Sequence, residues 1–247
     1  MIETFYTVLE LKLLLAVGIT FLGGLMLGYC GWGGAMVSMP LLVFLYGPVE
    51  ALAIMVVGYF ILLVSLIRSS IFRVDWQVMK YLLVSIVFFV PVGNLFLFLL
   101  DPILIRRAIG FIICFFSILI LFGWRYRGPF GGMPSVATGA ISGFISGFIG
   151  LGGPPLVIYL MATDKKADVQ RACILVGMTL LAGMIIITLI FQGGFNLETV
   201  YRGLMTTPLQ WVGGAIGAWL FSRIPSEFSK KFTISALIFL GISVALF

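Results

Sequence analysis

The sequence predicts an all-α polytopic membrane protein made of two inverted repeats of five helical segments each. Two observations predict this fold class. First, 62% of the 247 residues are hydrophobic and 10% are charged, with a mean hydropathy of +1.22. So few polar side chains cannot cover a soluble domain, and helices satisfy their own backbone hydrogen bonds within a bilayer. Second, one glycine-rich pattern occurs twice in the chain.

The repeated pattern keeps five glycines at identical spacing. The first copy consists of Gly24, Gly28, Gly31, Gly33 and Gly34, and the second of Gly143, Gly147, Gly150, Gly152 and Gly153. Gly58 and Gly177 extend the same register. These matches indicate an internal duplication. Interrupted apolar segments at corresponding positions of two halves point to the binding site of a transporter.

Apolar segments and turn residues divide the chain into two halves. We expect a first repeat over 1–127, a linker over 128–133 and a second repeat over 134–247. The segments of the first repeat are expected at 11–29, 35–46, 49–71, 77–100 and 103–123. Those of the second are expected at 134–149, 154–163, 168–191, 199–221 and 229–247. Glycine and proline pairs between the segments mark the turns.

The second segment of each repeat, 35–46 or 154–163, is shorter than the roughly 20 residues that a helical crossing needs. Each could be a thinned crossing, or could pair with the preceding helix as a re-entrant hairpin whose glycine-rich tip lies near the midplane. We favour the hairpin, and expect eight to ten crossing segments in all. Irregular backbone at membrane depth must be buried in protein or line a cavity.

Loop charges predict the orientation. Eleven basic residues fall on one side of the alternating loops: Arg68, Arg73, Lys80, Arg125, Arg127, Lys165, Lys166, Arg171, Arg223, Lys230 and Lys231. The other side has Lys12, Arg106, Arg107 and Arg202. The first side is therefore expected to be cytoplasmic, which places both termini outside the cytoplasm. We expect a multi-pass protein of the inner (plasma) membrane. Each repeat has an odd number of crossings, so the second repeat is inverted and the two tips can meet.

Each glycine-rich tip precedes a short helix. A helix N-terminus presents unpaired N–H donors and a partial positive charge, which favour anions. We therefore expect an anion site formed by Gly31, Gly33, Gly34, Gly150, Gly152 and Gly153. The remaining repeated glycines, Gly24, Gly28, Gly143 and Gly147, are interpreted as small residues that allow close helix packing.

Three side chains complete the expected substrate-binding set. Cys30 lies beside the first tip, although a small apolar packing role is the alternative. Asn94 and Gln210 lie inside the fourth segment of their repeats. A buried carboxamide could contact substrate or hydrogen-bond to a neighbouring helix, and both interpretations stay open.

Missing residue types restrict the chemistry. The chain has no histidine, its three cysteines have no ligand spacing, and its acidic residues all lie at segment ends. We therefore expect no metal or cofactor and no enzymatic activity. The expected partners are a small anionic substrate and the lipid bilayer, without nucleic acid. A coupling proton and a homo-oligomer are left open.

The chain resembles the TauE/SafE sulfite-exporter family of TSUP membrane transporters along nearly its whole length. The resemblance rests on Gly28-x-x-Gly31-x-Gly33-Gly34 followed by Pro40-Leu41-Leu42, on Gly147-x-x-Gly150-x-Gly152-Gly153-Pro154-Pro155, and on Arg73-Val74-Asp75-Trp76. It implies a secondary transporter for the export, or sometimes the uptake, of sulfite, thiosulfate, sulfonates or related organosulfur anions, and we expect export. We expect alternating access around a midplane site that the two glycine-rich breaks form.

Other functions fit the same sequence. An anion channel or an uptake carrier for small anions could use the same scaffold, and a membrane subunit without transport activity is a third alternative. Family members often carry a Thr-Ser pair where this chain has Ala51–Gly58 with no hydroxyl side chain. The resemblance therefore does not specify the substrate.

Overall fold

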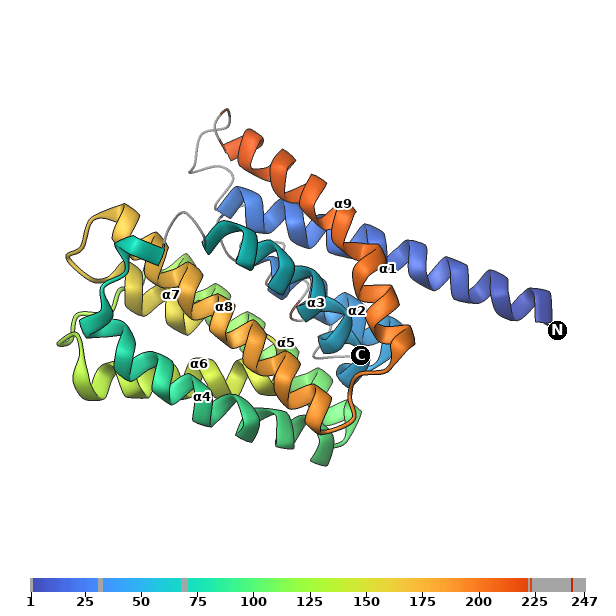
Figure 1. Ribbon diagram of the computed structural model, residues 1–247, viewed down its shortest axis with the longest axis horizontal. Coiled ribbons are helices and arrows are strands. Elements are labelled where there is room, and N and C mark those ends of the chain that lie inside the picture. Colours follow the sequence, from blue (N-terminus) through green and yellow to red (C-terminus); the bar gives the residue numbers. More distant parts are fainter. Residues whose placement is uncertain (1, 31–32, 68–70, 222, 224–240, 242–247) are drawn as a thin grey trace.

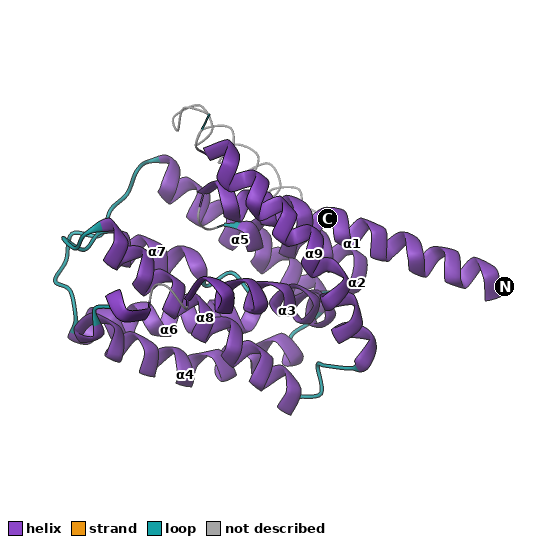
Figure 2. Ribbon diagram, turned by 45° about the horizontal axis from the view of Figure 1, so that its top comes forward, coloured by secondary structure: helices purple, strands orange, loops and turns teal. Residues whose placement is uncertain are grey.

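The computed structural model describes residues 2–30, 33–67, 71–221, 223 and 241 (Figure 1). Within this part of the chain all regular structure is helical, and no strand occurs (Figure 2). The helices are α1 (Ile2–Cys30), α2 (Gly34–Tyr46), α3 (Pro48–Ile67), the short 3₁₀ helix η1 (Ile71–Arg73), α4 (Trp76–Leu99), α5 (Pro102–Leu121), α6 (Gly132–Ile149), α7 (Gly153–Met161), α8 (Ala167–Phe191) and α9 (Leu197–Phe221). The expectation of an all-helical fold is confirmed for these residues.

The helix ends follow the turn residues in the sequence. The Asp75 carboxylate caps α4 by accepting the backbone N–H of Gln77 at 3.1 Å. Asp101 caps α5 in the same way, ahead of a proline that needs no hydrogen-bond acceptor at that position. Helix α1 begins at Ile2, well before the predicted residue 11, and projects beyond the other helices toward the N-terminus (Figure 1). The last predicted segment, 229–247, lies outside the described residues except at position 241.

Helices α2 and α7 each fold back along the helix before them. On α2, Gly34 lies against Gly23, and four residues later the Ser38 hydroxyl donates to the Ile19 carbonyl at 3.5 Å. The contacts run down α1 as they run up α2, so the two helices are antiparallel. Helix α7 pairs with α6 in the same sense. Gly152 faces Ser142 and Ser146, whereas the Tyr159 hydroxyl lies 2.8 Å from Ser135 Oγ.

Helices from the two halves of the chain pack against each other. The most extensive helix pairs are α1 with α9 and α4 with α6, so the first α-helix of each half packs along the fourth α-helix of the other. At the predicted packing glycines, an added methyl group would press against or overlap the backbone of the facing helix. The prediction that these four glycines serve helix packing is confirmed: Gly24, Gly28, Gly143 and Gly147.

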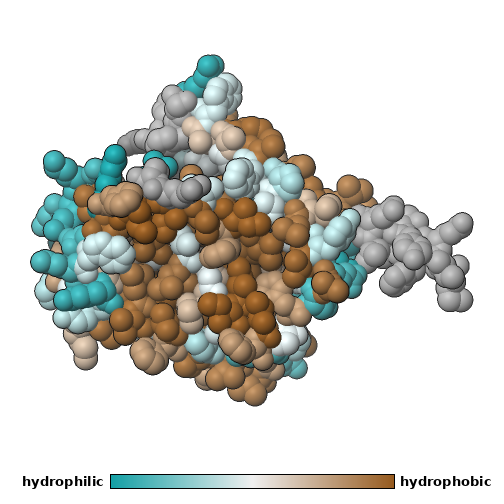
Figure 3. Space-filling model, viewed as in Figure 1, coloured by the Kyte–Doolittle hydropathy of each residue, from teal (hydrophilic) through white to brown (hydrophobic). Residues whose placement is uncertain are grey.

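Six helices in the described part are long and apolar enough to cross a membrane: α1 over Leu11–Tyr29, α3, α4, α5, α6 and α8. Helix α2, with 13 residues, and α7, with nine, are shorter. At 1.5 Å per residue they extend about 20 and 14 Å, well under the roughly 30 Å of a bilayer core. Apolar side chains cover most of the face seen in Figure 3, and hydrophilic residues gather mainly at one end.

Candidate functional site

The first glycine-rich break separates α1 from α2. Gly33 caps the N-terminus of α2 with φ +83°, a left-handed conformation that glycine adopts without steric cost. Its carbonyl accepts the Met36 N–H at 2.9 Å. The N–H groups of Gly34 and Ala35 lie at the very start of the helix, where backbone donors have no hydrogen-bond acceptor within the helix. Two predicted site residues cannot be placed: Gly31 and the side chain of Cys30 lie outside the described part.

The second break separates α6 from α7. Gly150 ends α6 at φ +73°, and its N–H donates to the Ser146 carbonyl at 2.8 Å. Gly152 precedes α7 in an ordinary right-handed conformation. The next residues are Gly153, Pro154 and Pro155. Because the two prolines have no N–H, the first turn of α7 offers fewer donors than that of α2.

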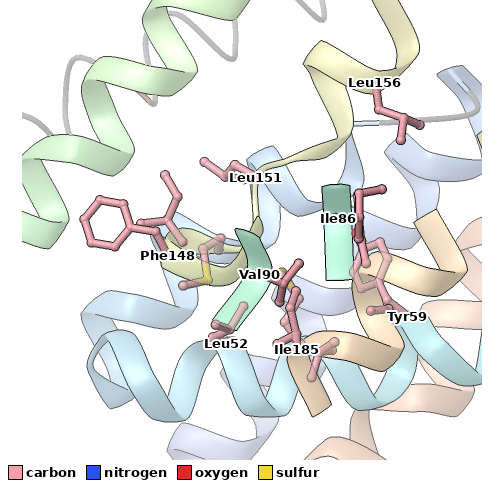
Figure 4. Close-up of a cluster of buried hydrophobic side chains, with 14 of the residues drawn as sticks. Leu52, Tyr59, Ile86, Val90, Phe148, Leu151, Leu156 and Ile185 are labelled. Atoms are coloured by element: carbon pink, nitrogen blue, oxygen red, sulfur yellow. The ribbon is translucent and has the colours of Figure 1, made fainter. Parts of the chain in front are cut away.

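Both breaks line one cavity of about 80 Å³. Gly33 and Gly34 border it from the first break, and Gly150 and Gly153 from the second. The lining otherwise consists mainly of apolar side chains of α3 and α8, including Met55, Met178 and Ile185. Figure 4 shows part of the surrounding core, with Leu52 and Tyr59 of α3, Leu151 beside the second break and Ile185 of α8. Two breaks that are 119 residues apart in sequence therefore meet at one place in the fold.

The other predicted site residues lie outside this lining. A methyl group on Gly152 would collide with the Ser142 carbonyl, so that glycine allows α7 to approach α6. Asn94 is fully buried on α4 and donates to Thr188 Oγ1 of α8. Gln210 on α9 lies between Gly24 of α1 and Gly58 of α3. The two carboxamides therefore occupy corresponding places between helices of opposite halves.

Sequence reasoning missed two polar residues of the cavity lining. Ser146 comes from the last turn of α6, and Tyr59 from the middle of α3. Tyr59 is only 9% exposed, and its hydroxyl has no hydrogen-bond partner among the described residues. A methyl group on Gly34 would collide with that hydroxyl, so the phenol lies directly against the start of α2. Tyr59 directly follows Gly58, which continues the spacing of the repeated glycines. That position in the sequence could have indicated that Tyr59 lies near the breaks.

Ion pairs join the halves at both ends of the helical bundle. At one end Arg202 of α9 pairs with Glu50 of α3 and with Glu198, and its guanidinium lies 4.9 Å from the centre of the Tyr46 ring. Sequence reasoning treated Arg202 as a loop charge, yet it is 9% exposed. Long side chains can bury their apolar stems near helix ends in this way.

At the opposite end, Lys165 Nζ lies 2.8 Å from Asp75 Oδ2. The hydrogen bond from Lys165 holds the pKa of the Asp75 carboxyl below its usual value, because it stabilises the charged form. A second pair, Arg73 with Asp168 at 3.8 Å, joins the same loops. Lys165 and Asp168 belong to the second half of the chain, whereas Arg73 and Asp75 belong to the first.

Comparison with known proteins assigns the family. The family model described as Sulfite exporter TauE/SafE matches residues 16–244, which is nearly the whole chain. The chain belongs to the TauE/SafE sulfite-exporter family. Membership in this transporter family, together with the six apolar helices, identifies a membrane transporter of sulfur-containing anions. No curated protein and no solved structure matches the chain.

Proposed function

We propose that this TauE/SafE protein is a secondary carrier that binds a small sulfur-containing anion in the cavity between the two glycine-rich breaks and exports it by alternating access. The observation that carries the proposal is the shared lining, with Gly33 and Gly34 on one side and Gly150 and Gly153 on the other. The N-termini of α2 and α7 each supply unpaired N–H groups and a partial positive charge. No basic side chain is needed to attract an anion there.

The proposed architecture is an inverted repeat with two re-entrant hairpins, α1 with α2 and α6 with α7. Their antiparallel pairing and the exchange of packing partners between halves support it. In this arrangement the hairpins enter from opposite faces of the membrane, and their tips meet at the cavity. In this position the two breaks could be exposed to one face of the membrane and then to the other, as alternating access requires.

The ion pairs at the two ends suggest how access alternates. Arg202 with Glu50 and Lys165 with Asp75 each link one half of the chain to the other, at opposite ends. A carrier opens to one face by breaking inter-half contacts at that face while keeping those at the other. Export is the favoured direction, because a monoanion leaving a negative cell gains about 2.3 kcal/mol per 100 mV.

Counterflow in proteoliposomes tests the transport mechanism. Vesicles loaded with unlabelled sulfite and diluted into a trace of ³⁵S-sulfite should accumulate label transiently, because a carrier exchanges substrate across its site. A channel instead gives a voltage-driven current without stimulation by trans substrate. Absence of both flux and binding, for sulfite, thiosulfate and methanesulfonate alike, would refute transport of these anions by this chain.

Cysteine labelling tests the proposed orientation. The native cysteines Cys30, Cys114 and Cys173 are first replaced by alanine, and then Arg127→Cys or Arg106→Cys is introduced. An impermeant maleimide should reach position 127 only from the cytoplasmic side and position 106 only from outside. The reverse pattern would overturn the orientation while leaving the cavity and its role untouched.

A further inference from the structure

The lining of the cavity follows the internal repeat of the sequence. Several lining residues occupy equivalent positions of the two halves, with the same 119-residue spacing as the repeated glycines. They are Leu27 with Ser146, Gly34 with Gly153, Ala35 with Pro154, Tyr59 with Met178, and Leu63 with Ala182. The two halves therefore contribute to the cavity in equivalent ways. Where the paired residues differ, the two ends of the cavity differ in chemistry.

One difference concerns the backbone donors at the two breaks. At the first break, the N–H groups of Gly34 and Ala35 have no acceptor within α2. At the second break Gly153 also has an N–H, but the residue equivalent to Ala35 is Pro154. In proline a ring carbon takes the place of the amide hydrogen. Helix α7 therefore lacks a donor at the position where α2 has one.

A second difference is Ser146, which is equivalent to Leu27. Ser146 lies in the last turn of α6, lines the cavity and is 4% exposed. Its carbonyl accepts the Gly150 N–H at 2.8 Å. Its hydroxyl makes no hydrogen bond within the described part of the chain, and it is not fully enclosed as the hydroxyls of Tyr59 and Ser142 are. A buried donor without a partner is unfavourable, so this hydroxyl points to a ligand that accepts from it.

The place of Ser146 connects the two differences. Its Oγ lies beside the start of α7, since a methyl group on Gly152 would come within 2.6 Å of it. The hydroxyl is thus at the second break, where Pro154 has no N–H. At the first break the Ala35 N–H is present, and the residue equivalent to Ser146 is the apolar Leu27. Each end of the cavity therefore has one further donor besides the glycine N–H.

We propose that Ser146 is a substrate-binding residue whose hydroxyl donates to the anion the hydrogen bond that Pro154 cannot donate. This inference rests on the proposed function, because it assigns a further contact to the same cavity. The anion then accepts two hydrogen bonds at each break, and one of the four comes from a side chain. Hydrogen bonds to a charged acceptor are stronger than those between neutral groups, so the loss of one should be measurable.

Binding of methanesulfonate to the detergent-solubilised full chain tests the proposal. Ser146→Ala should weaken binding by about 10- to 100-fold, the range for a hydrogen bond to a charged group. Its melting temperature without ligand should be unchanged or higher, because the hydroxyl has no partner in the protein and alanine favours a helix.

Ser142→Ala is the matched control for Ser146→Ala. It removes a buried hydroxyl of the same helix, one turn earlier, that has no partner and is not part of the described lining. Its affinity for methanesulfonate should stay within about two-fold of the wild-type value, because no contact with the anion is lost. An equal loss in both serine variants would refute a direct hydrogen bond from Ser146.

A rescue experiment tests whether the hydroxyl replaces the missing N–H. Pro154→Ala restores a backbone N–H at the cavity. The double variant Ser146→Ala/Pro154→Ala should therefore bind methanesulfonate about ten-fold more tightly than Ser146→Ala. Pro155→Ala restores an N–H one residue later, outside the described lining, and should give no such gain. Equal gains from both proline variants, or a gain from neither, would refute the replacement.

The remaining outcomes separate this inference from the proposed function. Unchanged affinity in Ser146→Ala, with tight binding by the wild type, would remove Ser146 from the site and leave the carrier intact. A wild-type protein that binds neither methanesulfonate nor sulfite nor thiosulfate would refute the anion site itself. If the Pro154→Ala protein fails to fold, the comparison of Ser146→Ala with Ser142→Ala still decides whether Ser146 binds the anion.

Discussion

Gly153→Ala offers the most direct test of the cavity as the substrate site. Gly153 is the first residue of α7 and lines the cavity, with φ outside the left-handed region. A methyl group there would meet only the end of the Met178 side chain, at 3.3 Å. That side chain is flexible and can move. Alanine also restricts the unfolded chain more than glycine does, so stability without ligand should stay the same or rise by up to about 1 kcal/mol.

Ligand binding should respond differently. The added methyl group takes up a volume comparable to that of a water molecule, about 30 Å³, in a cavity of about 80 Å³. Overfilling a packed site costs about 1–3 kcal/mol, which corresponds to a loss of affinity of about 5- to 150-fold. Isothermal titration of methanesulfonate into the purified variant measures this loss, and thermal unfolding without ligand measures stability.

Gly152→Ala is the matched control, one residue earlier. A methyl group at Gly152 would collide with the Ser142 carbonyl and come within 2.6 Å of Ser146 Oγ. Helix α7 would have to move away from α6, so we expect a loss of stability of about 1–3 kcal/mol. Unchanged affinity in a stable Gly153→Ala protein would show that the anion binds elsewhere. An equal loss of stability in both variants would refute the distinction between lining and packing glycines.

Two further predictions concern residues outside the cavity. Asn94→Leu removes the hydrogen bond to Thr188 and also a buried amide oxygen without a partner, so thermal stability should change by no more than about 1 kcal/mol. Methanesulfonate affinity should stay within two-fold, and a ten-fold loss would make Asn94 a binding residue. Lys165→Gln should lower the melting temperature by about 1–3 °C between pH 5 and 8. The pKa of Asp75 is lowered in the folded protein, so the gap should begin to narrow as the pH falls below the ordinary carboxyl pKa of about 4 and should close once Asp75 is protonated in the folded state. A gap that persists after folded Asp75 is protonated would refute the role of the pair.

Much of the fold follows from local signals in the sequence. Helix α2 was expected at 35–46 and α7 at 154–163, close to their observed bounds of Gly34–Tyr46 and Gly153–Met161. Glycine and proline interrupt helices for local steric reasons, so such boundaries can be predicted from one segment at a time. The start of α1 was missed because residues 2–10 are polar enough to end an apolar pattern, yet they are compatible with a helix.

The candidate site was only partly predictable. Equal spacing identified the two breaks, but it did not separate Gly153, which lines the cavity, from Gly152, which packs on α6. Neighbouring residues on a helix point in different directions, and the direction that meets a cavity depends on where the other helices lie. Asn94 was included in the expected site for a similar reason. The sequence alone cannot distinguish a buried amide that contacts substrate from one that hydrogen-bonds to a neighbouring helix, as Asn94 does with Thr188.

By itself, the sequence determined that the chain is a helical membrane protein, that it carries a duplicated glycine-rich break, and that its family resemblance is to sulfite exporters. These properties depend on composition, spacing and local backbone preference. Only the tertiary structure brought the two breaks to one cavity, placed the Tyr59 hydroxyl against α2, and buried Arg202 beside Glu50. Each of these contacts joins residues that are far apart in the chain or belong to different helices. Such contacts arise from how the helices pack, which no local pattern specifies.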